Sequence, residues 1–138
     1  MQFIPYLSFD GRCEEAFGYY QKHLGGKIVA MARWGEAPEG QRPEGAEGQK
    51  DKIMHAMLEA KGALLMGADA PPNFFQKAQG VCVSVNLDDA EEGERIFNAL
   101  ADGGQVNMPY AETFWAEGFG MCVDKFGVPW MVNCGKPQ

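Results

Sequence analysis

Apolar and polar positions along this chain follow one order of patterns twice. Each copy begins with a run in which apolar and polar residues alternate, and this run is followed by a stretch with helical apolar spacing. A Gly-Gly pair ends the helical stretch, and a second alternating run follows it. With Asp10 set against Asp88, an offset of 78 residues, Gly25-Gly26 falls on Gly103-Gly104. A later element repeats at an offset of 65, where Met66 falls on Met131. The pattern predicts two copies of one unit, each too small to build a sufficient core alone.

Within each copy the pattern predicts a strand, a helix and three further strands. The first copy has helical spacing from Cys13 to Leu24, and its expected strands cover 3–9, 27–34, 53–60 and 63–68. In the second copy Asp89 and Glu92 have the spacing of a capping box at the start of a helix. The expected strands of the second copy cover 81–87, 105–109, 119–123 and 128–134.

The predicted fold class is therefore α+β, with tandem βαβββ modules over 1–70 and 80–138 that form a single domain. We expect curved mixed sheets around a cavity between the modules, with the helices on the outer face. Residues 35–50 are rich in Gly, Pro and Glu and offer little to bury, so they predict a flexible surface loop or lid.

Composition narrows the classes of partner. The 138 residues carry a formal net charge of −7, which argues against nucleic acid and anionic membrane surfaces as partners. The start of the chain has no signal-peptide pattern and no run reaches transmembrane length, so we expect a cytoplasmic protein. The four cysteines have no C-x-x-C spacing, which favours reduced thiols over a disulfide framework.

Several blocks of sequence resemble the PhnB-like group of the vicinal oxygen chelate superfamily, which includes glyoxalase I, extradiol dioxygenases and bleomycin-resistance proteins. The blocks that carry the resemblance are Pro5-Tyr6-Leu7-Ser8-Phe9-Asp10-Gly11, Cys13-Glu14-Glu15-Ala16, Phe97-Asn98-Ala99-Leu100-Ala101-Asp102-Gly103-Gly104, Glu112-Thr113-Phe114-Trp115, Phe119-Gly120-Met121 and Asp124-Lys125-Phe126-Gly127-Val128-Pro129-Trp130. The resemblance implies the paired-module fold and a homodimer. Members often carry the label 3-demethylubiquinone-9 3-methyltransferase, but no glycine-rich nucleotide loop follows a strand in a parallel βαβ unit here.

The resemblance also implies where a metal would be held, because superfamily enzymes use one side chain on the first and last strand of each module. Those positions fall near Ile4 and Cys82 and on Met66 and Met131. None of the four is the histidine or carboxylate that the usual divalent metals take, so we expect no metal cofactor. Two interpretations of Cys82, Met66 and Met131 stay open. They form a soft Cu(I) site, or the methionines line an adaptable apolar ligand pocket in which Cys82 is a small buried apolar residue.

Strand alternation singles out further candidates for a site. His55 and Glu59 share one face of their strand and the opposite face is apolar, so we expect both side chains to face the cavity. His55 would act there as a general base or as a hydrogen-bonding contact to a ligand, or it would lie at the cavity rim with a neighbouring residue as its hydrogen-bond partner. Glu112, Thr113 and Trp115 combine a carboxylate, a hydroxyl and an indole, which suits a polar corner of a ligand pocket or an anchored loop. Asn133 shares the face of Met131 and adds an amide.

Three functions remain open from the sequence. The first is a metal-free protein that binds a small apolar or aromatic ligand in the cavity between the modules. The second is a metal-independent enzyme with His55 or Glu112 as acid or base. The third is a structural dimer without a ligand.

Overall fold

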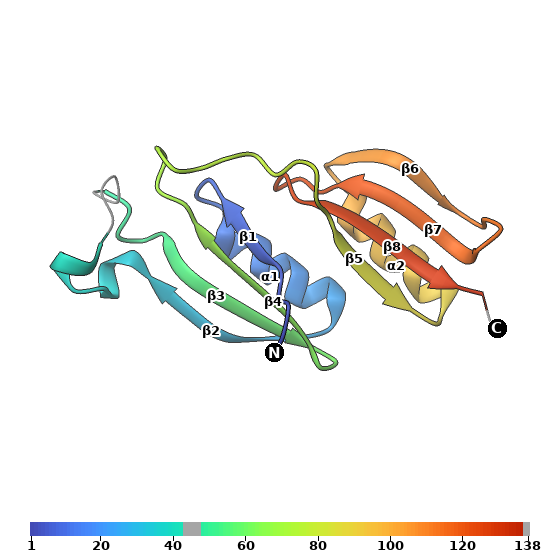
Figure 1. Cartoon of the computed structure of the whole chain (residues 1–138), viewed down its shortest axis with the longest axis horizontal. Helices are drawn as coiled ribbons and strands as arrows, with labels where there is room; N and C mark the ends of the chain where they lie inside the picture. The colour runs from blue at the N-terminus through green and yellow to red at the C-terminus, as the bar shows by residue number, and fades with distance from the viewer. Residues whose placement is uncertain (43–47, 137–138) are drawn as a thin grey trace. The chain divides into compact units, whose positions relative to one another are not determined.

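The computed structural model describes residues 1–42 and 48–136, and it divides into two compact units, Met1–Lys77 and Ala78–Gln138. Each unit runs strand, helix, strand, strand, strand along the chain (Figure 1). In the first unit these elements are β1 (Tyr6–Phe9), α1 (Cys13–Leu24), β2 (Lys27–Arg33), β3 (Ile53–Ala60) and β4 (Ala63–Asp69). In the second they are β5 (Val83–Leu87), α2 (Ala90–Ala101), β6 (Gln105–Ala111), β7 (Ala116–Val123) and β8 (Pro129–Gly135).

Both units build the same mixed sheet. The strand order is β1-β4-β3-β2 in the first unit and β5-β8-β7-β6 in the second. The first strand of each unit pairs parallel with the last strand, and the remaining neighbours are antiparallel. The predicted α+β class and the repeated βαβββ order are therefore confirmed.

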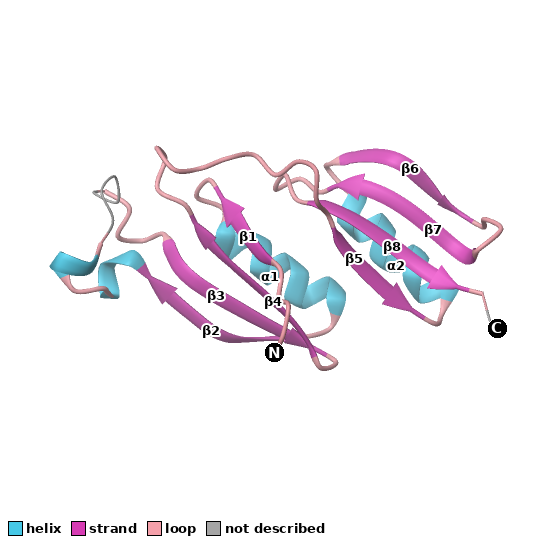
Figure 2. Cartoon of the chain, viewed as in Figure 1, coloured by secondary structure: helices cyan, strands magenta, loops and turns pink. Residues whose placement is uncertain are grey.

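One helix packs on each sheet (Figure 2). From α1 the side chains of Ala16, Phe17 and Tyr20 are fully buried, and from α2 those of Phe97 and Leu100 are buried. These positions follow the helical spacing seen in the sequence, because residues three and four apart share one face of a helix. The helices lie close to their sheets at glycines, since a methyl group added to Gly67 would meet the Phe17 ring at 2.8 Å.

The two helices are capped in different ways. The Asp89 carboxylate accepts from the backbone N–H groups of Glu91 and Glu92, which confirms the predicted N-cap of α2. The Glu92 carboxylate accepts from Arg95. At α1 the residue before the helix is Arg12, and the N-terminal N–H of Cys13 instead donates to Asp69 from the end of β4. A distant carboxylate thus serves the positive end of α1.

Asp69 is a buried carboxylate that joins three elements of the first unit. Its side chain is 2% exposed and accepts from Cys13 N at 2.9 Å and from Ile53 N at 2.8 Å. Its backbone carbonyl accepts from the Trp34 indole at 3.1 Å. A buried charge is tolerated only when hydrogen bonds replace its hydration, and here they link the start of α1 and the start of β3 to the end of β4.

Some predicted boundaries are wrong. The first strands begin at Tyr6 and Val83, so Ile4 and Cys82 precede them, and β7 begins at Ala116 rather than at 119. Ile53 is fully buried although alternation places it beside His55, because a register irregularity lies at the start of β3.

The loop predicted over 35–50 contains two short 3-10 helices, Trp34–Glu36 and Glu39–Gln41, in its described part. The loop's start and end are joined, since Gly35 N donates to the carbonyl of Lys50. Arg42 donates to the carbonyl of Ala37. The expected mobility falls partly on residues 43–47, which lie outside the described residues. No helix in the described ranges combines the length and apolar content needed to cross a membrane.

We predict that Asp69→Ala lowers the free energy of unfolding by about 2–5 kcal/mol, because two buried N–H donors lose their acceptor. Asp69→Asn should cost less, about 1–3 kcal/mol, because one oxygen remains to accept one of the two bonds. Urea denaturation measures both. Glu112→Ala is the control, because its side chain is 72% exposed, and it should change stability by less than about 0.5 kcal/mol. A loss at Asp69→Ala no larger than the control would contradict the anchoring role.

Candidate functional site

In the described part of the first unit no long helix packs on the second face of the sheet, and strand register defines which side chains lie there. Gly67 faces α1 and is the register partner of Ala56, so these two positions point to the core. The next residues along each strand, Met66 and Met57, are also partners and must point to the other side. We call this side the open face of unit 1; it carries Tyr6, Ser8, His55, Met57, Met66 and Ala68.

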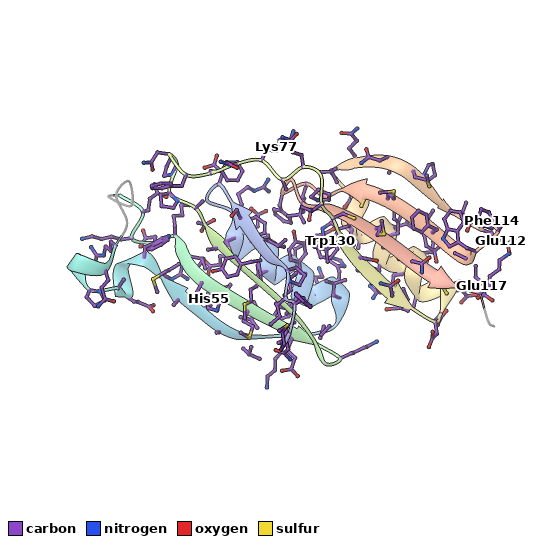
Figure 3. All side chains as sticks on the ribbon, viewed as in Figure 1. His55, Lys77, Glu112, Phe114, Glu117 and Trp130 are labelled. Atoms are coloured by element: carbon purple, nitrogen blue, oxygen red, sulfur yellow. The ribbon has the colours of Figure 1, made fainter. Side chains whose placement is uncertain are left out.

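His55, labelled on β3 in Figure 3, makes the main polar contact that defines this face. Its Nδ1 lies 3.1 Å from the Tyr6 hydroxyl, and the two rings stack with centroids 5.8 Å apart. Partial burial raises the pKa of the Tyr6 phenol, so the hydroxyl keeps its proton at neutral pH. His55 is half-buried, and Glu59, further along the same strand, is exposed beside Lys27.

The open face of unit 2 follows from the same argument. A methyl group on Gly120 would meet the Phe97 ring of α2 at 2.6 Å, and Gly120 is the register partner of the buried Val132. The adjacent pairs Met121 with Met131 and Phe119 with Asn133 therefore point away from α2. We call this side the open face of unit 2; it carries Ser84, Asn86, Met108, Phe119, Met121, Met131 and Asn133.

Three polar residues on this second face form a hydrogen-bonded chain. The Asn133 amide donates to Asn86 Oδ1 at 3.2 Å, and the Asn86 amide donates to the Ser84 hydroxyl at 2.9 Å. The sequence pointed to Asn133, but it gave no reason to join Ser84 and Asn86 to it. Only the parallel register of β5 with β8, which pairs Asn86 with Asn133, brings them together.

The segment between β6 and β7 places the other candidates at one end of the second sheet (Figure 3). The Thr113 hydroxyl accepts from Ala116 N at 3.0 Å, so it shapes the turn. The Glu112 carboxylate is exposed and lies 3.6 Å from Lys136 Nζ, a geometry typical of a weak surface ion pair. The Trp115 ring packs edge-on against Phe119, which brings it next to the open face of unit 2.

The positions that would hold a metal in the resembling superfamily do not fit the usual ions. In register the partners of Met66 and Met131 are Tyr6 and Ser84, which replace the expected Ile4 and Cys82 as the facing residues. A phenol, a hydroxyl and two thioethers lack the imidazole and carboxylate ligands that these metals prefer. Among the described residues no group of three or more His, Cys, Asp or Glu side chains is placed to hold a metal ion.

The four cysteines fall into two classes. Cys82 is exposed, whereas Cys13, Cys122 and Cys134 are buried. Burial raises the pKa of the Cys122 thiol to about 11, and it raises the pKa values of Cys13 and Cys134 as well. Since the thiolate is the reactive form, the three buried thiols should be inert.

Comparison with known proteins agrees with this architecture. A family model described as 3-demethylubiquinone-9 3-methyltransferase matches residues 1–133. Protein YjdN of Escherichia coli strain K12 is 39% identical over 144 residues, which cover 100% of this chain and 98% of that protein. Protein PA1353 from Pseudomonas aeruginosa superimposes with a TM-score of 0.89 and 48% identity over 99% of each chain.

Two further solved structures extend the likeness. The PhnB protein from Bacillus cereus, described with the same methyltransferase name, has a TM-score of 0.78 and 26% identity over 98% of this chain and 100% of its own. The fosfomycin resistance protein FosX from Listeria monocytogenes has a TM-score of 0.63 and 9% identity over 99% of this chain and 93% of its own. At that identity the likeness to FosX shows the fold alone.

We predict that protein purified without chelator carries far less than one Zn, Ni, Mn or Fe ion per chain, because the side chains at the ligand positions do not suit these metals. Elemental analysis checks this, and about one such ion per chain would contradict it. The Cu(I) alternative through Cys82, Met66 and Met131 stays a prediction. Competition with a chromogenic Cu(I) chelator measures the affinity of the protein for copper. Weaker copper binding by Cys82→Ser than by the wild type would support this alternative.

We also predict that a disulfide reagent at pH 8 titrates one thiol per native chain quickly, the exposed Cys82, and all four only after unfolding. Cys82→Ser should remove the fast reaction and leave the slow ones unchanged. A second fast thiol in the native protein would mean that one of the buried positions opens readily.

Proposed function

The chain belongs to the 3-demethylubiquinone-9 3-methyltransferase-like (PhnB) family of the vicinal oxygen chelate superfamily, and on that premise we propose that it is a small-molecule-binding protein. In this proposal the ligand is a small apolar or aromatic molecule that binds an open sheet face without the superfamily's usual divalent metal. That the ligand lies between the two modules, as the sequence suggests, stays a prediction.

One observation carries the proposal: both open faces have the same apolar row at the same register. In unit 1 the row across the strands is Ala30, Met57 and Met66, ending at Tyr6. In unit 2 it is Met108, Met121 and Met131, ending at Ser84. Five methionines on sheet faces that no described helix of their own unit covers are unusual for surfaces that meet only water, because burying apolar side chains stabilises a fold.

Methionine suits a binding surface for physical reasons. Its unbranched chain and polarisable sulfur adapt to ligands of different shape, and sulfur makes favourable contacts with aromatic rings. Each row ends next to polar groups, which are His55 with Tyr6 in unit 1 and Asn133 with Asn86 in unit 2. An apolar surface with a few polar groups that fix orientation is the usual composition of a small-molecule site.

The methyltransferase description of the family model is not part of the proposal. A nucleotide-type donor site of the Rossmann class is built where two parallel strands flank a helix connection. Here α1 connects β1 to β2, and these strands lie at opposite edges of their sheet. The second unit has the same arrangement of β5 and β6.

A second candidate function, a metal-independent enzyme, is favoured by the pair of Tyr6 and His55. A phenol within hydrogen-bond distance of an imidazole can pass or hold a proton, which is the requirement for acid–base chemistry. Glu112 is the weaker candidate, because its exposed carboxylate is paired with Lys136. Loss of a measured turnover on His55→Ala, with binding of the same compound retained, would favour the enzyme over the binding protein.

Methionine-methyl NMR tests the binding proposal. The chain has 8 methionines, of which Met31 is an internal control, because its register partner is the core-facing Ala56. With anisole and indole as probes we expect saturable shifts of methyl signals on the open faces, while the Met31 signal stays unchanged. Shifts confined to surface residues away from both faces would refute the proposal and favour a structural dimer.

Two variants sharpen this test. Met131→Glu places a charge in the apolar row of unit 2, and Met66→Glu does so in unit 1, so each should weaken probe binding at its own face about tenfold or more. Circular dichroism should show that both variants keep their fold, since neither side chain packs on a helix. Unchanged affinity in both variants would contradict binding to the methionine rows.

A further inference from the structure

One polar atom on the open face of unit 2 has no partner. The Asn133 carboxamide oxygen is buried and accepts no hydrogen bond, and it is the single side-chain oxygen or nitrogen of this kind found within residues 1–42 and 48–136. Folding a polar atom away from water without a partner costs free energy, so such atoms call for an explanation. The neighbouring contacts decide whether the atom is truly the oxygen.

The orientation of the two amides follows from their contacts with Ser84. The Asn86 amide group that approaches Ser84 lies 2.9 Å from its hydroxyl and 3.5 Å from its carbonyl oxygen. A carbonyl oxygen only accepts, so this longer contact favours the nitrogen over the oxygen as the Asn86 atom beside Ser84. The Asn86 oxygen then faces Asn133, which must present its own nitrogen at 3.2 Å. The Asn133 oxygen is consequently the atom left without a donor.

The other copy of the repeat shows that the fold does not require this amide. Asn133 pairs with Asn86 in the sheet of unit 2, and the equivalent pair in unit 1 is Ala68 with Ser8. Register and neighbouring strands are the same, yet the position of Asn133 holds an apolar methyl group. An amide that the fold can do without, and that leaves an acceptor unpaired, is better explained by recognition than by stability.

We propose that the oxygen of Asn133 is a recognition group for a ligand that carries a hydrogen-bond donor, an O–H or N–H group, next to an apolar body. The proposal rests on the proposed binding function, and it names the ligand class for the open face of unit 2. The apolar body lies against Met131 and Met121, which are on the same face, and the donor reaches Asn133. A ligand reaches this buried oxygen only if a neighbouring side chain moves, and the methionines on the same face are adaptable because their side chains have three rotatable bonds.

Two variants of Asn133 separate recognition from a structural role. Asn133→Leu removes the unpaired oxygen and also the amide that donates to Asn86. Asn86 is exposed, so water can replace that bond, and the urea midpoint should rise by about 0.5 M. Asn133→Asp keeps an acceptor but adds a charge at a half-buried site, so it should lower the midpoint. Asn107→Leu, at an exposed position on β6, controls for the effect of placing leucine in a strand. A lower midpoint for Asn133→Leu than for the wild type would overturn the proposal.

Matched probes test the recognition itself. 4-Ethylphenol has a donor and 4-ethylanisole replaces it with a methyl ether, so the wild type should bind the phenol about fivefold more tightly. Asn133→Leu should lose this preference for the phenol, and Asn133→Asp should keep it. The shift of the Met131 methyl NMR signal on titration measures the affinity for each probe. Equal affinity of the wild type for both probes would overturn the proposal. Failure of either probe to bind would instead count against the binding function, while the stability of Asn133→Leu still tests the unpaired oxygen.

Discussion

One helix against a four-stranded sheet is the constraint from which the other features of each unit follow. A sheet has two faces, and within the described parts of each unit a single long helix covers one of them. The covered face holds the core and leaves room for the helix at Gly67 and Gly120, where a side chain would collide with Phe17 or Phe97. Because side chains alternate along a strand, the same alternation that fills the core also defines the opposite face. The open faces are thus a direct consequence of how the core is built.

The two copies keep this frame and differ in their polar interior. Asp69 joins α1, β3 and β4 in unit 1, while the equivalent position in unit 2 is the buried Cys134. In unit 2 the buried carboxylate is Asp124, which accepts from Val128 N at 2.9 Å and from the Trp130 indole at 2.8 Å. Each buried charge is satisfied by hydrogen bonds from its own unit, so the copies reach a similar core by different polar contacts.

The open faces of the two units also differ in their polar residues. The methionine rows occupy equivalent positions, but the polar groups beside them are a phenol and imidazole in unit 1 and two amides and a hydroxyl in unit 2. Under the proposed binding function, the shared apolar surface would supply general affinity and the distinct polar groups would supply selectivity. Family membership by itself supplies the fold and leaves this chemistry to the individual chain, since function depends on the site.

The sequence alone determined the repeat, the fold class and most elements, because apolar periodicity and glycine stops are local signals; α1 begins and ends where its spacing predicts. It also placed His55, Met66, Met131 and Asn133 on one side of their strands by alternation. Only the tertiary structure decided which residues face them across the sheet, since strand register depends on pairing between distant segments. Strand register places Tyr6 beside His55 and Asn86 beside Asn133. In the structure the first strands begin after Ile4 and Cys82. Ile53 lies in the core because of a register irregularity in β3 that the local sequence pattern does not predict.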